Sequence, residues 1–141
     1  MKTEIRGYSN LIIEKYYSDN ITILAGQPGS GKTYQINQSL EFDISKKLLL
    51  ASESDCENEY LTVDTIEKIP YCKTEWETSV LENFTSLLNI LETHISKSYD
   101  LIIMDNVPFE SFKQINTLLK LCLEYPNTKF YLLFDKLLEI E

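Results

Sequence analysis

Residues 26–33 read Gly26-Gln27-Pro28-Gly29-Ser30-Gly31-Lys32-Thr33, an unbroken match to the pattern G-x-x-x-x-G-K-[ST]. An apolar run over residues 21–25 precedes this stretch, and a segment with helical spacing of apolar residues follows it. Glycine allows positive φ and a close approach of the backbone to a ligand, so successive N–H groups can form an anion site at a helix N-terminus. The pattern therefore predicts a phosphate-binding loop between a strand and a helix.

Individual side chains of this loop have expected roles. Lys32 is expected to reach the β- and γ-phosphates of a nucleotide, and the hydroxyl of Thr33 is expected to bind Mg²⁺. The predicted nucleotide-binding residues are Gly26, Gln27, Pro28, Gly29, Ser30, Gly31, Lys32, Thr33 and Tyr34. We therefore expect the chain to bind ATP together with Mg²⁺.

Length and composition indicate a single cytoplasmic domain. The chain has 141 residues, which predicts one domain over residues 1–141 with one core. Neither a signal region nor an apolar stretch of membrane-spanning length is present in the sequence, so we expect no membrane partner. The three cysteines contain no C-x-x-C pair, as expected of reduced thiols. His94 is the sole histidine, which excludes a zinc site built from histidines.

The charge balance bears on partners. The formal net charge is −9, and Arg6 is the only arginine of the chain. A module that binds nucleic acid by itself usually carries a basic patch that neutralises phosphates. The lysines here are scattered, so direct nucleic-acid binding is disfavoured.

Apolar patterning predicts alternating strands and helices. Strands are expected at residues 20–25, 47–52, 101–104 and 129–134, with a short edge strand at 60–63 before a break at Pro70. Helices are expected at 8–17 (packed on the core at the sheet edge), at 32–40, from the capping box Thr74-x-x-Glu77 to about residue 95, and from Pro108 to Pro126. The alternation predicts an α/β fold with a mainly parallel sheet of about four to five strands that is covered on both faces. Together with the glycine-rich loop, this pattern resembles the three-layer αβα fold of P-loop NTPases.

The two later helices are expected to face the core through long apolar stripes. In the first of them the stripe comprises Trp76, Val80, Leu81, Phe84, Leu87, Leu88, Leu91 and Ile95. In the second it comprises Phe112, Ile115, Leu118, Leu119 and Cys122.

A second candidate site element follows the strand at 101–104. Four apolar residues precede Asp105, which is the form of a Walker B motif. A carboxylate at the end of a buried strand can hold Mg²⁺, directly or through water, near the hydroxyl of Thr33. Ligands in doubly wound sheets lie beyond the carboxyl ends of the strands. We therefore expect Thr33 and Asp105 to be the metal ligands at one edge of the sheet.

Glu53 follows the apolar strand at 47–52, and here the chain resembles the RecA/DnaB-like (ASCE) branch of P-loop ATPases, from about residue 20 to about residue 135. In that branch the strand after the P-loop helix ends in a catalytic glutamate. The resemblance implies that Glu53 polarises the attacking water beside Lys32, and that Asp135 or Lys136 stands in the sensor region. The other interpretation of Glu53 is a solvated acid in an acidic segment. Asn106 occupies the place directly after the Walker B acid, where many related ATPases have glutamate.

The chain departs from that family in ways that bear on mechanism. It resembles a short or minimal form, and no arginine follows residue 6 to serve as a finger. Either the chain is degenerate, or Lys136 is the finger, or a second copy or another protein partner supplies the positive charge. In each case we expect slow ATP hydrolysis, with a partner, in a nucleic-acid-related process.

Two alternatives stay open. The loop is also similar to that of zeta-toxin-like P-loop kinases, in which Glu53 or Asp55 would be the base toward a small-molecule acceptor. Such kinases clamp the transferred group with arginines, which this sequence lacks there. The other alternative is a non-catalytic regulatory or assembly subunit that binds the nucleotide.

Overall fold

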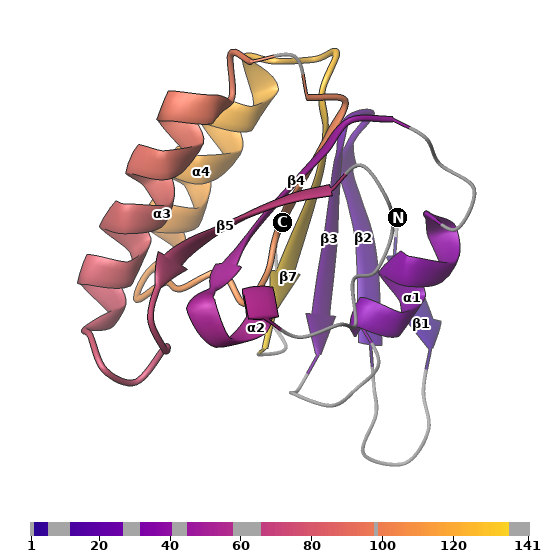
Figure 1. The fold of residues 1–141 in the computed structure, drawn as a ribbon. Helices are drawn as coiled ribbons and strands as arrows, with labels where there is room; N and C mark the ends of the chain where they lie inside the picture. The colour runs from indigo at the N-terminus through magenta and orange to yellow at the C-terminus, as the bar shows by residue number, and fades with distance from the viewer. Residues whose placement is uncertain are drawn as a thin grey trace.

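The structure is a computed structural model that describes residues 2–5, 12–26, 32–40, 45–57, 66–97 and 99–135. It is a mixed α/β fold (Figure 1). Its elements follow in the order β1 (Lys2–Ile5), β2 (Ile12–Ser18), β3 (Ile21–Gly26), α1 (Lys32–Ser39), β4 (Lys47–Ser52), α2 (Glu53–Glu57), β5 (Ile66–Cys72), α3 (Val80–His94), β6 (Leu101–Met104), α4 (Phe112–Leu123) and β7 (Lys129–Phe134).

The described strands form one mostly parallel sheet. Its seven strands have the order β1-β2-β3-β7-β6-β4-β5. The pairs from β3 to β5 are all parallel, whereas β1 and β2 add an antiparallel pair beside β3. A mainly parallel sheet is therefore confirmed. The predicted count of about four to five strands is too low, because the antiparallel pair extends the sheet.

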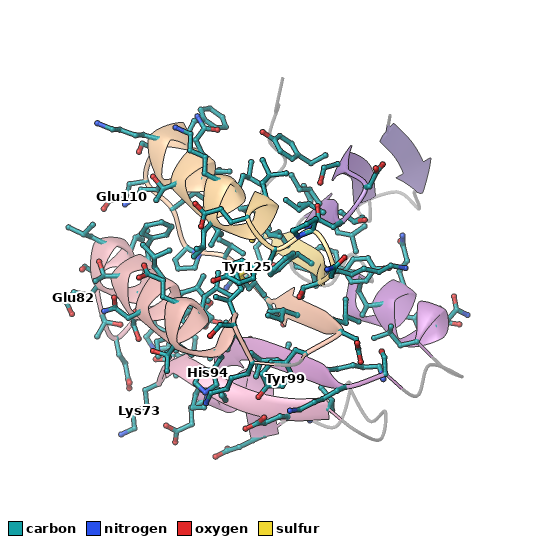
Figure 2. The ribbon with its side chains drawn as sticks, turned by 90° about the horizontal axis from the view of Figure 1, so that it is seen from above. Lys73, Glu82, His94, Tyr99, Glu110 and Tyr125 are labelled. Atoms are coloured by element: carbon teal, nitrogen blue, oxygen red, sulfur yellow. The ribbon has the colours of Figure 1, made fainter. Side chains whose placement is uncertain are left out.

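Helices pack on both faces of this sheet (Figure 2). The central strands β4 and β6 are buried along their whole length, as expected of parallel strands that are covered on two sides. On one face, side chains of α3 and α4 pack against the strands. On the other, Ile36 of α1 and Leu40 just after it pack against Leu24, Leu49 and Ile103.

The local predictions are confirmed where pattern and burial agree. The strands expected at 20–25, 47–52, 101–104 and 129–134, and the helix expected at 32–40, match the observed elements to within one residue at either end. The short strand expected at 60–63 lies outside the described residues.

The helix expected at 8–17 is wrong from residue 12 onward, and residues 8–11 lie outside the description. Residues Ile12–Ser18 form β2, which pairs with β3 on one side and with β1 on the other. The apolar spacing of so short a segment fits a strand as well as a helix. The segment forms a strand because it can hydrogen-bond to the backbone of β3.

Pro70 does not end the element that contains it. It lies within β5, in register with Ala51 of β4. Because β5 is the last strand at this side of the described sheet, a residue without an N–H can be accommodated there.

The capping box predicted at Thr74-x-x-Glu77 is also wrong. The N–H of Glu77 donates to the carbonyl of Thr74 in a turn, and α3 begins later, at Val80. The cap is Ser79, whose hydroxyl accepts from the N–H of Glu82 at 3.1 Å. Trp76 therefore belongs to the turn and is 79% exposed.

Some stripe residues of the two later helices also face solvent. Val80 and Leu81 lie at the start of α3 and are exposed, whereas the later members Phe84, Leu87 and Leu91 are buried. Phe112 is exposed too, because α4 begins there and not at Pro108. The preceding chain is held on β7 by a bond from the N–H of Val107 to the carbonyl of Leu133.

Candidate functional site

Four parallel strands end close together at one edge of the sheet. They are β3, β7, β6 and β4, in that spatial order. The chain leaves them at Gly26, Asp135, Asp105 and Glu53 respectively. Since β7 lies between β3 and β6, Asp135 follows a strand that separates the glycine-rich loop from Asp105. The strand order alone brings these four chain segments to one edge.

Lys32 is folded back over the end of β3. Its side chain is only 6% exposed, and its Nζ donates to the carbonyl of Gly26 at 2.6 Å. The same Nζ lies 3.2 Å from Oδ1 of Asp135. Lysine is rarely buried unless it is paired, and here a carbonyl and a carboxylate both accept from it. Lys32 thus places a compact positive charge at the edge where the strands end.

Only part of the predicted nucleotide set falls within the description. Residues 27–31 lie outside it, as does the side chain of Thr33. Tyr34 is exposed on α1, and its hydroxyl accepts from Nε2 of Gln38 at 2.9 Å. Of the nine predicted residues, Gly26 and Lys32 are therefore the two whose mutual contact is seen.

Asp105 is buried at the end of β6, and its backbone is held by residues of β4 and β5, the two strands that follow β6 in the sheet order. Its N–H donates to the carbonyl of Leu50 in β4 at 2.8 Å. The buried Tyr71 of β5 donates its hydroxyl to the carbonyls of Asp105 (3.0 Å) and Asn106 (2.8 Å). Burial raises the pKa of Tyr71, so the hydroxyl stays protonated and remains a donor.

Asn106 has a positive φ of 49°. Asparagine tolerates this left-handed region better than most residues, which gives a local reason for asparagine at the position after Asp105. The bond from Tyr71 to its carbonyl holds this turn in place. Sequence reasoning missed the role of Tyr71, because a tyrosine in an edge strand carries no distinguishing pattern.

The acids after β4 are arranged by a helix cap. Ser52 is buried, and its Oγ accepts from the N–H of Asp55 at 3.2 Å, which starts the short helix α2. Glu53 is then the first helical residue and is exposed, whereas Asp55 is half-buried. The spacing Ser52-x-x-Asp55 could have predicted this cap.

Asp55 is also the acid that interacts with the rest of the edge. Its pKa is raised above the usual range, first by burial, then by the charge of Glu75, with a smaller contribution from Asp135. The carboxyl groups of Asp55 and Glu75 are close enough to share a hydrogen bond. The structure therefore brings Asp55, Glu75 and Asp135 into electrostatic contact, and Lys32 is bonded to the last of them.

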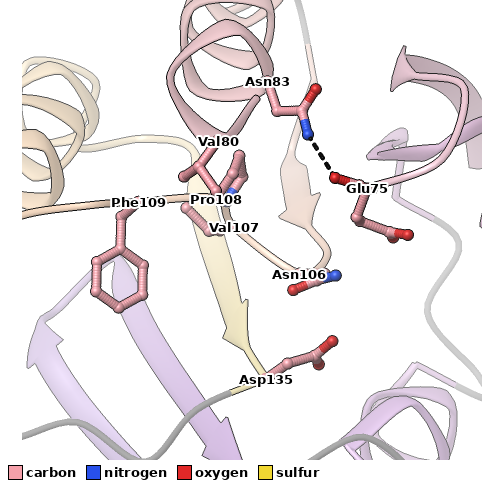
Figure 3. A pocket seen from close by; sticks show the side chains of 8 residues that line it. All are labelled: Glu75, Val80, Asn83, Asn106, Val107, Pro108, Phe109 and Asp135. Carbon is pink, nitrogen blue, oxygen red and sulfur yellow. Dashed lines mark hydrogen bonds between the residues drawn. The ribbon is translucent and has the colours of Figure 1, made fainter. Parts of the chain in front are cut away.

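A pocket of about 120 Å³ opens beside Asp135 (Figure 3). It is lined by Glu75, Val80, Asn83, Asn106, Val107, Pro108, Phe109 and Asp135. Buried Asn83 holds one wall, since its Nδ2 donates to the carbonyl of Glu75 at 3.2 Å and its Oδ1 accepts from Thr78. This bonding also explains why residues 75–78 form a turn over the start of α3. Phe109 packs edge-on against Phe134 and forms the apolar side.

The donor set at this edge suits a cation that arrives with its own ligands. Among the described residues no group of three or more His, Cys, Asp or Glu side chains is arranged to hold a metal ion. Mg²⁺, however, is commonly held by one or two protein oxygens together with waters and substrate phosphates. Asp105, a buried carboxylate at the same edge of the sheet as the buried Lys32, fits that mode.

Comparisons of the chain with protein-family models, with curated proteins and with solved structures give no match. Across the described part of the chain, none of the helices combines the length and the apolar character needed to cross a membrane.

Proposed function

We propose that this chain binds a nucleoside triphosphate with Mg²⁺ at the carboxyl edge of its sheet, as a P-loop protein of the RecA/DnaB-like ATPase type. One observation carries the proposal. The lysine of an intact G-x-x-x-x-G-K-[ST] loop is buried at the end of β3, and Asp105 is buried at the end of β6 on the same edge. The helices on both faces of the mostly parallel sheet support the three-layer αβα fold on which such sites occur.

Each residue has a defined task on this proposal. The loop from Gly26 to Thr33 binds the phosphates through its N–H groups, and Lys32 neutralises charge on the β- and γ-phosphates. Thr33 and Asp105 hold Mg²⁺, which when bound withdraws charge from the phosphate oxygens. Tyr71 keeps the backbone of Asp105 in position through the bond to its carbonyl.

The strand order supports the ATPase type. A residue that senses the γ-phosphate must lie between the glycine loop and the metal-binding acid. Asp135 follows β7, whose neighbours are β3 and β6, and it contacts Lys32. The end of β7 is therefore a suitable sensor position, as the resemblance implies.

Two acids are candidates for orienting the attacking water. Glu53 has the position implied by the resemblance, and its exposed side chain leaves it free to turn when a partner binds. Asp55 has the environment of a base, because its raised pKa makes it a stronger proton acceptor. On the ATPase proposal, removing the responsible acid abolishes phosphate release and leaves nucleotide binding intact.

The pocket beside Asp135 favours a second candidate function. Its apolar wall and its carboxylate and amide groups suit a small acceptor next to the transferred phosphoryl group, as in a P-loop kinase. On that alternative Asp55 is the base toward the acceptor hydroxyl. A nucleotide-binding subunit without turnover is the third possibility, and it differs from both in releasing no product.

The test is nucleotide-dependent stabilisation of the purified protein, followed by product analysis. Mg·ATP is expected to raise the Tm of the wild-type chain, because a ligand that binds the folded state alone stabilises it. Lys32→Ala should remove this shift. The control Lys120→Ala should keep it, because Lys120 is an exposed residue in the last turn of α4. Circular dichroism of each variant establishes that it is folded.

A full Tm shift in folded Lys32→Ala would contradict the proposed site. Given binding, free phosphate as the product supports the ATPase, a phosphorylated acceptor supports the kinase, and neither product supports the regulatory subunit.

A further inference from the structure

The amine of Lys32 already has an anionic partner within the chain. Its Nζ lies 3.2 Å from Oδ1 of Asp135 and 2.6 Å from the carbonyl of Gly26. On the proposed function, this amine is the group that contacts the β- and γ-phosphates. A carboxylate and a terminal phosphate would therefore compete for the same positive charge.

We infer that Asp135 is an internal anion that stands in for the γ-phosphate on Lys32, and that it thereby determines how strongly the site discriminates between nucleoside triphosphate and diphosphate. This inference rests on the proposed function and adds to it a residue that determines specificity.

The position of Asp135 makes this competition direct. It follows β7, between the end of β3, where the glycine loop begins, and the end of β6, where Asp105 lies. Its side chain is 30% exposed, so it is neither fixed in the core nor fully solvated. It also lines the pocket of about 120 Å³, which gives the carboxylate room to move when a phosphate takes its place.

Electrostatics makes the displacement unfavourable. Asp55, Glu75 and Asp135 already interact, as the raised pKa of Asp55 records. A γ-phosphate brings further negative charge to this edge, and like charges at short range repel strongly where water is partly excluded. A diphosphate can use the loop and the β-phosphate contact while Asp135 stays paired with Lys32. Asp135 therefore weakens ATP binding more than ADP binding.

The test compares Kd values of Mg·ATP and Mg·ADP by isothermal titration calorimetry for four proteins: the wild type, Asp135→Asn, Asp135→Glu and Asp19→Asn. Asp135→Asn keeps an oxygen that can accept from Lys32 and removes the negative charge. Its affinity for Mg·ATP is expected to rise about tenfold and not more, since solvent screens the partly exposed pair. Its affinity for Mg·ADP should rise clearly less, because ADP binding leaves Asp135 paired with Lys32. The ratio Kd(ATP)/Kd(ADP) therefore falls.

The matched control is Asp19→Asn. Asp19 is exposed in the turn between β2 and β3, at the opposite edge of the sheet, and the change in net charge is the same. Its Kd ratio should equal that of the wild type. Asp135→Glu keeps the charge and should also keep the ratio, which a purely structural role of Asp135 would not require. If Asp135→Asn fails to fold by circular dichroism, Asp135→Ser replaces it, with the same expectation.

The outcomes separate the two claims. An unchanged Kd ratio in the folded neutral variant, with binding that still depends on Lys32, overturns the role of Asp135 and leaves the proposed nucleotide site standing. If neither nucleotide binds to the wild type or to any Asp135 variant, the proposed function fails, and this inference fails with it. A lower ratio in Asp135→Asn alone supports both.

Discussion

Among the described residues, the two faces of the sheet carry buried apolar clusters of very different size. The face under α3 and α4 carries a cluster of 21 buried residues, including Phe84, Phe130 and Phe134. The face under α1 carries 8 among the described residues, and α1 itself contributes Ile36 to it, with Leu40 just beyond its end. Because burial of apolar surface is the main stabilising contribution, the α3–α4 face supplies the larger share of the stability that the described residues provide.

The thinner face has a functional meaning. The helix α1 begins with Lys32, whose amine lies in the candidate phosphate site. Elements with few buried contacts open locally at lower free energy than the core, and ligand-binding elements are often drawn from that class. We therefore expect α1 to gain order when nucleotide binds, whereas α3 and α4 stay as they are.

The largest effect is expected in the thick core. Leu91 is fully buried on α3, so Leu91→Ala removes methylene groups and leaves a cavity. The free energy of unfolding should fall by about 3 kcal/mol, measured by urea denaturation. Leu81→Ala on the same helix is the control, because Leu81 is exposed and should lose less than about 0.5 kcal/mol. Equal losses at the two positions would contradict the assignment of the core.

A smaller effect is expected on the thin face. Ile36 is buried between α1 and the sheet, but the short helix can move to fill part of the space that Ile36→Ala leaves. Unfolding should become easier by about 2 kcal/mol, and Mg·ATP affinity should fall as well, because α1 carries Lys32. Leu91→Ala serves as the comparison, since it should leave the affinity of the folded protein unchanged. A loss of affinity in Leu91→Ala alone would reverse the functional contrast between the faces.

The smallest effect concerns Asp55, at the carboxyl edge of the sheet, which interacts with Glu75 and Asp135. The pKa of Asp55 is raised in the folded chain, so the folded state binds its proton more tightly than the unfolded state does. The free energy of unfolding therefore decreases as pH rises from the ordinary value of 3.8 through the raised pKa. Asp55→Asn should flatten this decrease and stabilise the protein at pH 7 by less than about 1 kcal/mol, since Asp55 is half exposed.

Urea denaturation at several pH values, with Glu53→Gln as the exposed control, measures that difference. An identical pH profile for Asp55→Asn and the wild type would show that the edge carries no unfavourable charge interaction at this position.

Prediction from sequence succeeded where neighbours along the chain determine the structure. The buried runs at 47–52 and 101–104 could become only strands that are covered on both faces, and they did. It failed where a distant partner decided, as at β2, which became a strand because β3 offered its backbone. It also failed at Trp76, which was expected to face the core. The buried Asn83, seven residues later, bonds to the carbonyl of Glu75 and stabilises a turn there, so the ring of Trp76 stays in solvent.

The candidate site divides in the same way. The glycine spacing, Lys32 and the apolar run before Asp105 are local patterns, so the sequence alone predicts a phosphate loop and a metal-binding acid. The meeting of Lys32 with Asp135, the bond from Tyr71 to the backbone of Asp105 and the contact of Asp55 with Glu75 depend on strand order. These residues lie far apart along the chain, and only the pairing of β7 between β3 and β6, with β5 beyond β4, brings them to one edge.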